Sequence, residues 1–120
     1  MVTTRELGDI AEKLAQEHLI KLGYKILDTN WYHGHLELDI VARDKDELVI
    51  VEVKARSGIR YEHPSEAVTN TKIKRIVEAA DAYIIEKDLD VETRFDIITV
   101  IFVHEQFELE HFKDAFYPTM

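Results

Sequence analysis

The chain has 120 residues, of which 46% are hydrophobic and 32% are charged, and it contains no cysteine. This length and apolar content predict one domain, residues 1–120, with a core of its own, and the lack of cysteine excludes disulfide bonds and thiolate metal sites. The net charge of −9 at first argues against nucleic acid as a partner, because surplus carboxylates repel phosphates.

The first predicted element is a helix over residues 5–22. Thr3 and Glu6 have the spacing of a capping box, and Gly23 stands where helices commonly end. Glu12 lies at the margin of the predicted buried face, where it can border the core without being buried in it. The residues that recur at helical spacing and define this face are Leu7, Ile10, Ala11, Leu14, His18 and Leu22.

Three predicted strands follow, over residues 24–29, 35–43 and 48–55. Residues 30–34 are expected to form a turn or irregular link, and residues 44–47 a polar hairpin loop. The third strand is almost wholly apolar, which predicts a central strand buried on both faces. A helix over residues 71–87, a strand over 93–103 and an edge strand over 106–112 complete the order. The pattern α-β-β-β-α-β, with a final β, predicts an α/β (α+β) fold with a mixed central sheet flanked by helices.

Two neighbouring strands are expected to bring acidic side chains together. Glu52 and Lys54 share one face of the third strand, and the hairpin loop places Asp39 of the second strand opposite residue 51 or 52. Two carboxylates held together in a sheet repel each other unless a divalent cation lies between them, and oxygen ligands of this kind suit Mg²⁺ or Mn²⁺. Lys54 could then orient a metal-bound water or stabilise charge on a phosphate. The structural alternative is an ion pair, which a half-exposed strand accommodates better than a central one.

The charge is unevenly distributed along the chain. Residues 54–75 carry six basic and two acidic side chains, whereas the rest of the chain is acidic. On charge alone this segment is a solvated loop and helix start, but it follows the acidic constellation directly. Arg56, Arg60 and Lys72 are therefore candidate contacts to nucleic-acid phosphates, with surface solubility as the alternative.

Other residues leave alternatives open. Glu37 could bind a second metal or a water, or be a solvated acid. Asp96 stands in an apolar strand and needs a partner, for which Arg94 on the same face is the preferred structural choice. Trp31 and Tyr32 could stack on an unpaired base, but packing is the preferred interpretation.

Asp39, followed after 12 residues by Glu52-Val53-Lys54, resembles the D…(D/E)xK signature of the restriction-endonuclease-like superfamily, PD-(D/E)XK. The closer resemblance is to the YraN-like family, small bacterial proteins akin to archaeal Holliday-junction resolvases, and it spans nearly the whole chain. Many members have a glycine where this chain has Leu36. The motifs that carry the resemblance are Gly8-x-x-Ala11-Glu12, Leu22-Gly23-Tyr24-x-Ile26-Leu27, Asn30-Trp31, Glu37-Leu38-Asp39-Ile40-Val41, Val51-Glu52-Val53-Lys54-x-Arg56, Lys72 and Arg94-Phe95-Asp96.

The resemblance implies an α-β-β-β-α-β core and a Mg²⁺-dependent (or Mn²⁺-dependent) endonuclease that hydrolyses DNA, including branched or unusual structures. It implies catalytic roles for Asp39, Glu52 and Lys54, and a metal held by Asp39, Glu52 and Glu12. A homodimer is compatible with this expectation. Two other classes remain open, a non-catalytic nucleic-acid-binding module that keeps the fold and a protein-interaction domain. We expect a cytoplasmic protein with no membrane partner, because no apolar run approaches the roughly 18 residues that span a bilayer and the first residues lack the apolar stretch of a signal peptide.

Overall fold

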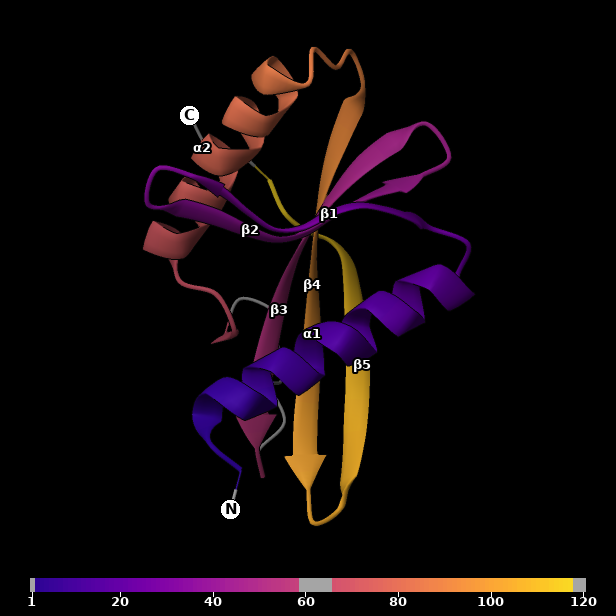
Figure 1. Ribbon diagram of the computed structural model, residues 1–120, viewed down its shortest axis with the longest axis vertical. Helices are drawn as coiled ribbons and strands as arrows, with labels where there is room; N and C mark the ends of the chain where they lie inside the picture. Colours follow the sequence, from indigo (N-terminus) through magenta and orange to yellow (C-terminus); the bar gives the residue numbers. More distant parts are fainter. Residues whose placement is uncertain (1, 59–65, 118–120) are drawn as a thin grey trace.

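The computed structural model describes residues 2–58 and 66–117. A five-stranded sheet in the order β1-β2-β3-β4-β5 forms its centre; β3 and β4 are parallel, and the other neighbours are antiparallel. The helices pack on opposite faces of this sheet, so the predicted mixed sheet flanked by helices is confirmed (Figure 1). The elements are α1 (Thr4–Lys21), β1 (Lys25–His33), β2 (Leu36–Asp44), β3 (Glu47–Ser57), α2 (Asn70–Glu86), β4 (Glu92–Val103) and β5 (Gln106–Phe116).

The central strand β3 is buried on both faces, as its apolar run predicts. Val49 and Val51 belong to the cluster on the α1 side, whereas Leu48 and Ile50 belong to the cluster on the α2 side. This alternation follows from the two-residue period of a strand. Glu52 and Lys54 therefore leave β3 on the side that α2 covers.

Helix α1 begins and ends close to its predicted limits. The Thr3 hydroxyl accepts a hydrogen bond from the Glu6 backbone N–H at 3.1 Å, which satisfies one of the unpaired donors of the first turn. Gly23 follows the helix with φ of +91°, a conformation that glycine adopts without a steric penalty.

The buried face of α1 differs from the predicted one. Ala11, Ala15 and Leu19 are fully buried, whereas Ile10 and Leu22 are 43% and 49% exposed. The two alanines are small, so this side of the helix can approach the sheet closely, and the contact face is centred on positions four residues apart. The prediction was wrong for Ile10 and Leu22 because it weighted side-chain size above the close approach that alanine permits.

Two strands are longer than expected. β1 extends to His33, so residues 30–33, which we expected in a turn, belong to the strand, and the hairpin turn holds only Gly34 and His35. β5 runs to Phe116 rather than to residue 112. Within the described part of the chain, neither helix has the length and apolar character needed to cross a lipid bilayer.

Candidate active site

The sheet opens between β2 and β3 at the predicted acidic residues. Backbone pairing runs from Asp44 opposite Glu47 to Ile40 opposite Val51, which confirms the predicted register. Beyond this pair the β1–β2 ribbon turns away from β3 (Figure 1). The Asp39 carboxylate accepts a hydrogen bond from the Val53 backbone N–H at 2.9 Å, a donor that a continued ladder would pair with backbone. We call the place where the two strands diverge the fork, and Asp39 links β2 to β3 at its narrow end.

A kink in the β1–β2 ribbon makes this fork. Leu38 packs on the α2 side of the sheet and Ile40 on the α1 side, although residues two apart share a face in a regular strand. Asn30 of β1 stands across from this point and has a φ of +47°. Asparagine is one of the few residues that adopt this left-handed conformation readily, so Asn30 allows the ribbon to twist without ending it.

Three carboxylates gather beside the kink. One oxygen from each of Glu12, Glu37 and Asp39 lies within 4.8 Å of the others. The Asn30 side-chain amide donates to Glu12 Oε2 at 3.1 Å and to Glu37 Oε1 at 3.4 Å, so the residue that kinks the ribbon also orients two of the acids. Glu12 lies at the margin of the buried face of α1, as expected. Glu37, whose role the sequence left open, joins the cluster.

Glu52 meets Asp39 from the other side of the fork. It is 5% exposed, and burial followed by the charge of Asp39 raises the pKa of Glu52 to about 8. Burial, with the charges of Glu12 and Glu37, raises the pKa of Asp39 to about 6, against the opposing effect of the Val53 N–H. Glu52 does not belong to the three-carboxylate cluster. Of the three predicted metal ligands, Asp39 therefore lies in the middle, with Glu12 of the three-carboxylate cluster on one side and Glu52 on the other.

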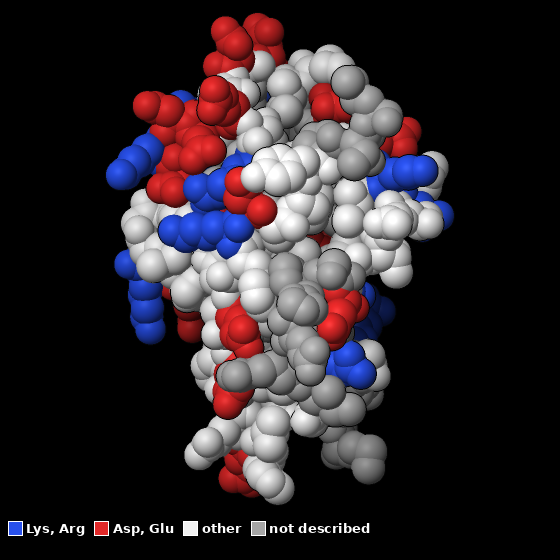
Figure 2. All heavy atoms as spheres, turned by 180° about the vertical axis from the view of Figure 1, so that it is seen from behind, with Lys and Arg blue, Asp and Glu red and all other residues white. Residues whose placement is uncertain are grey.

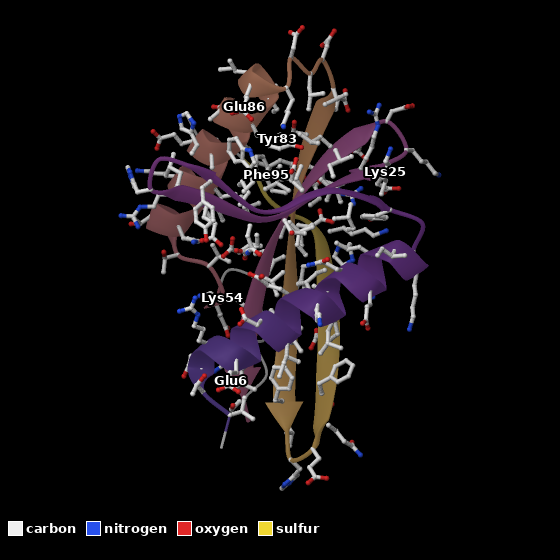
Figure 3. All side chains as sticks on the ribbon, viewed as in Figure 1. Glu6, Lys25, Lys54, Tyr83, Glu86 and Phe95 are labelled. Atoms are coloured by element: carbon white, nitrogen blue, oxygen red, sulfur yellow. The ribbon has the colours of Figure 1, made fainter. Side chains whose placement is uncertain are left out.

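Two lysines lie beside Glu52. Lys72 Nζ is 3.8 Å from Glu52 Oε1, and the charge of Lys54 also lowers the pKa of Glu52. Figure 3 shows Lys54 on β3 near the start of α2. Both lysines line a hollow of about 250 Å³ between Lys54 and the segment from Ala67 to Arg75, which we call the α2 pocket.

The remaining candidate phosphate contacts are less central. Arg56 is exposed near the end of β3. Arg60 lies outside the described residues. Arg75, which the sequence analysis did not single out, lines the α2 pocket together with the two lysines. Its position one turn beyond Lys72 on α2 is the signal that would have found it.

Asp96 has the structural partner that we predicted. Its carboxylate is fully buried and accepts hydrogen bonds from Arg94 Nε at 2.9 Å and Nη2 at 3.0 Å. His111 Nε2 of β5 lies 2.7 Å from the same carboxylate, a contact that no local spacing indicates. Burial opposes ionisation, but these partners outweigh it and hold the pKa of Asp96 below its usual value.

The two aromatic residues of β1 differ in their surroundings. Trp31 packs edge-to-face on Tyr83 of α2 with ring centroids 5.1 Å apart, which confirms the packing interpretation. Tyr32 is 61% exposed, so it does not belong to the core that Trp31 joins. The negative charge of Glu37 raises the pKa of Tyr32, which lies within reach of that carboxylate.

A histidine contact joins the end of α1 to β5. His18 Nε2 lies 3.1 Å from His111 Nδ1, and burial together with the charges of His111, Lys113 and Lys21 lowers the pKa of His18. The folded protein therefore resists a proton that the unfolded chain accepts, and the free energy of unfolding falls as pH drops below 6.5.

His18→Gln should remove this decrease in the free energy of unfolding at low pH. At pH 7.5 its free energy of unfolding should match wild type within about 1 kcal/mol, because one neutral hydrogen bond is changed. At pH 5.5 the variant should lose less stability than wild type, as measured by urea denaturation. His35→Gln, at an exposed turn position, is the matched control and should retain the pH dependence of wild type. Parallel pH curves for wild type and His18→Gln would contradict the assignment.

Fold and site together define an α/β protein with a carboxylate-lined fork in its sheet and basic side chains beside it. The family model described as "Uncharacterised protein family UPF0102" matches residues 11–100, and the chain belongs to this family. The chain is 51% identical over 120 residues to a UPF0102 protein of Bacteroides thetaiotaomicron, covering 100% of this chain and 99% of that protein. It is 47% identical over 117 residues to a UPF0102 protein of Flavobacterium psychrophilum, covering 98% of each. It is 45% identical over 117 residues to one from Parabacteroides distasonis, covering 98% of this chain and 97% of that protein.

Proposed function

We propose that this protein is a metal-dependent endonuclease of the restriction-endonuclease-like, PD-(D/E)XK superfamily, of the YraN-like type, which hydrolyses phosphodiester bonds in DNA. One observation carries the proposal: the buried carboxylate of Glu52 and the half-buried carboxylate of Asp39 meet at the fork between β2 and β3, beside Lys54. A sheet that needed only stability would not hold two acids in this way, because each raises the cost of ionising the other.

The chemistry of the donors fits a hard divalent cation. Every candidate ligand is a carboxylate oxygen. Mg²⁺ and Mn²⁺ prefer oxygen ligands, whereas softer metals prefer nitrogen or sulfur ligands. Asp39 is the common ligand, Glu52 lies on one side of it, and Glu12 and Glu37 lie on the other. Burial, and after it the charges of neighbouring carboxylates, raise the pKa values of Asp39 and Glu52, and a bound cation would offset both effects by stabilising the ionised forms.

A bound Mg²⁺ or Mn²⁺ supplies Lewis acidity at the phosphate and lowers the pKa of an attacking water. The Lys54 ammonium group, on the same side of β3 as Glu52, would donate to the phosphate and stabilise the charge that develops on it. Lys72 lies 3.8 Å from Glu52 and favours its ionised form, and it could turn to a phosphate oxygen once a bound cation stabilises that form instead. Asn30 holds Glu12 and Glu37 in place.

The acidic net charge does not exclude this partner, because one group of acids lies at the opposite end of α2 from Lys72. Figure 2 shows acidic side chains at the end of the molecule where α2 leads into β4, a stretch that contains Glu86, Asp88, Asp90 and Glu92. Lys72 lies in the first turn of α2 and Glu86 in its last, which separates them by roughly 20 Å at 1.5 Å per residue. DNA can therefore approach the first turn of α2 while the acidic end points away from it.

A panel of duplex, single-stranded, flapped and four-way DNA substrates tests the proposal. Wild type should cut at least one substrate with Mg²⁺ or Mn²⁺ and none with EDTA, and Lys54→Ala should lower the rate at least about 100-fold. Lys25→Ala is the control, because Lys25 is an exposed lysine at the start of β1, away from the fork (Figure 3).

Cutting that persists in Lys54→Ala would place the chemistry elsewhere. Salt-dependent binding without cutting on any substrate would favour the alternative function, a non-catalytic nucleic-acid-binding module. A protein that binds neither a metal ion nor DNA in these experiments would favour a protein-interaction domain.

A further inference from the structure

The α2 pocket brings together cationic side chains from two elements that are distant in sequence. Lys54 comes from β3, while Lys72 and Arg75 come from the first turns of α2. The buried side chains of Ala67 and Val68 line the same hollow. Three positive charges around one hollow repel each other, so this arrangement is favourable when an anion occupies it.

Carboxylates offset only part of this charge within the described residues. Of the three cations, only Lys72 has a carboxylate partner at ion-pairing distance there, and that partner is Glu52 of the fork. The first turn of α2 contains no acidic residue, so the positive end of the helix dipole adds to the same field. In a chain of net charge −9, this local excess of positive charge indicates an anion site.

The chemistry of the lining favours a phosphate. The Arg75 guanidinium can donate two parallel hydrogen bonds to phosphate oxygens, the Lys54 and Lys72 ammonium groups can donate others, and the Thr71 hydroxyl lines the same hollow. Because the α2 pocket adjoins Glu52, a phosphate bound there would belong to the same backbone as a group held at Asp39 and Glu52.

The hollow on the other side of the fork is less suited to a phosphate. It has a volume of about 340 Å³ and includes Asp9 and Glu12 against the single cation Lys13. A nucleic-acid strand that reaches the fork should therefore continue toward α2 and not along the outer face of α1.

We propose that the α2 pocket binds the backbone phosphate adjacent to the one that is cut, with Arg75 as its principal ligand. The identity of the neighbouring phosphate rests on the proposed function, whereas the anion site itself does not. Arg75 is the discriminating residue because it lines the pocket without contacting the fork acids.

Binding of a short fluorescent single-stranded oligonucleotide, measured by anisotropy in EDTA over a range of salt concentrations, tests this inference without catalysis. Arg75→Gln should weaken binding about tenfold and lower the salt slope by about 0.7, the contribution of one phosphate contact to a single strand. Arg75→Lys should keep the slope and recover part of the affinity, because the charge remains but the paired donors are lost.

Lys74→Gln is the matched control, because Lys74 is exposed on the same turn and lines a different hollow, with Val77 and Asp81. It should bind like wild type within about twofold, and thermal melting should show that every variant folds. Inorganic phosphate, at an ionic strength matched with chloride, should displace the oligonucleotide more readily from wild type than from Arg75→Gln.

The possible failures are distinguishable. If wild type cuts DNA but Arg75→Gln binds like Lys74→Gln, the pocket assignment is wrong and the proposed function stands. If wild type cuts nothing but Arg75→Gln still loses binding, the pocket stands and hydrolysis does not. If inorganic phosphate binds in an Arg75-dependent way while oligonucleotide binding ignores Arg75, the site serves a free anion and the inference is overturned.

Discussion

An Asp39→Asn protein should fold normally, bind no Mn²⁺ and cut no DNA. Asn retains a side-chain oxygen that can accept the hydrogen bond from the Val53 N–H, so the apex of the fork should survive. It lacks the negative charge that makes Asp39 the shared ligand between Glu52 and the acids of the three-carboxylate cluster. We expect calorimetry to show no Mn²⁺ binding and the cleavage rate to fall at least about 100-fold.

Asp39→Ala separates the structural role of this residue from its proposed chemical one. Alanine leaves the Val53 N–H without its partner in a half-buried position, which costs about 1–3 kcal/mol. Urea denaturation should therefore show Asp39→Ala less stable than Asp39→Asn, while both lack Mn²⁺ binding. Asp90→Asn, an exposed acid after α2, controls for the change in net charge. Full Mn²⁺ affinity in Asp39→Asn would remove the candidate metal centre from the fork.

The register of β2 and β3 could be predicted because short-range features determine it. The polar loop between the two strands holds only Lys45 and Asp46 in the structure, and a tight hairpin leaves little freedom in which residues pair. Once the register is known, Asp39 and Glu52 follow as neighbours, and the two-residue period places Lys54 on the same face as Glu52. This part of the candidate site is encoded within fewer than twenty residues.

The kink at Asn30 could not be predicted in the same way. A left-handed asparagine commonly marks a turn, and residues 30–34 contain the turn-forming Asn30 and Gly34. In the structure Asn30 bends a continuing strand, because its neighbours still pair with β2 on both sides. Whether such a residue ends a strand or bends it depends on what the ribbon packs against, here α2, and this information is not local.

The contacts around Asp96 show a second limit of what can be predicted from the sequence. Arg94 lies two residues away, so the strand period alone predicts it as a partner. His111 of β5 contacts Asp96, and His18 of α1 contacts His111, and only the completed fold brings these residues together. The acid cluster shows the same limit, since Glu37 and Glu12 are brought together by the kink and by the angle of α1 across the sheet.

Glu52 should make the metal-free protein less stable as pH rises. Its pKa is raised from 4.5 to about 8 in the folded state, so the folded protein holds a proton that the unfolded chain releases. The free energy of unfolding therefore falls between pH 4.5 and about 8 and levels off above. Each pKa unit corresponds to about 1.4 kcal/mol, so the loss from this group is on the order of a few kcal/mol. Asp39 contributes in the same direction between pH 3.8 and about 6.

Glu52→Gln should remove this cost, because glutamine does not ionise. In EDTA the variant should exceed wild type in free energy of unfolding by a few kcal/mol at pH 8, and by about 1 kcal/mol or less at pH 5. The difference between the two proteins at each pH isolates Glu52, since His18 and the other titrating groups are the same in both. Glu86→Gln, at the exposed end of α2, should show no such pH-dependent difference (Figure 3).

Adding Mn²⁺ completes this test. At pH 8 the cation should stabilise wild type, because it binds the folded state and offsets the repulsion between Glu52 and Asp39. It should stabilise Glu52→Gln far less, since one charged ligand is missing. Equal stabilisation of both proteins would mean that the cation does not bind beside Glu52. A wild-type protein no less stable than Glu52→Gln at pH 8 would show that the two carboxylates do not share the buried contact on which the proposed chemistry depends.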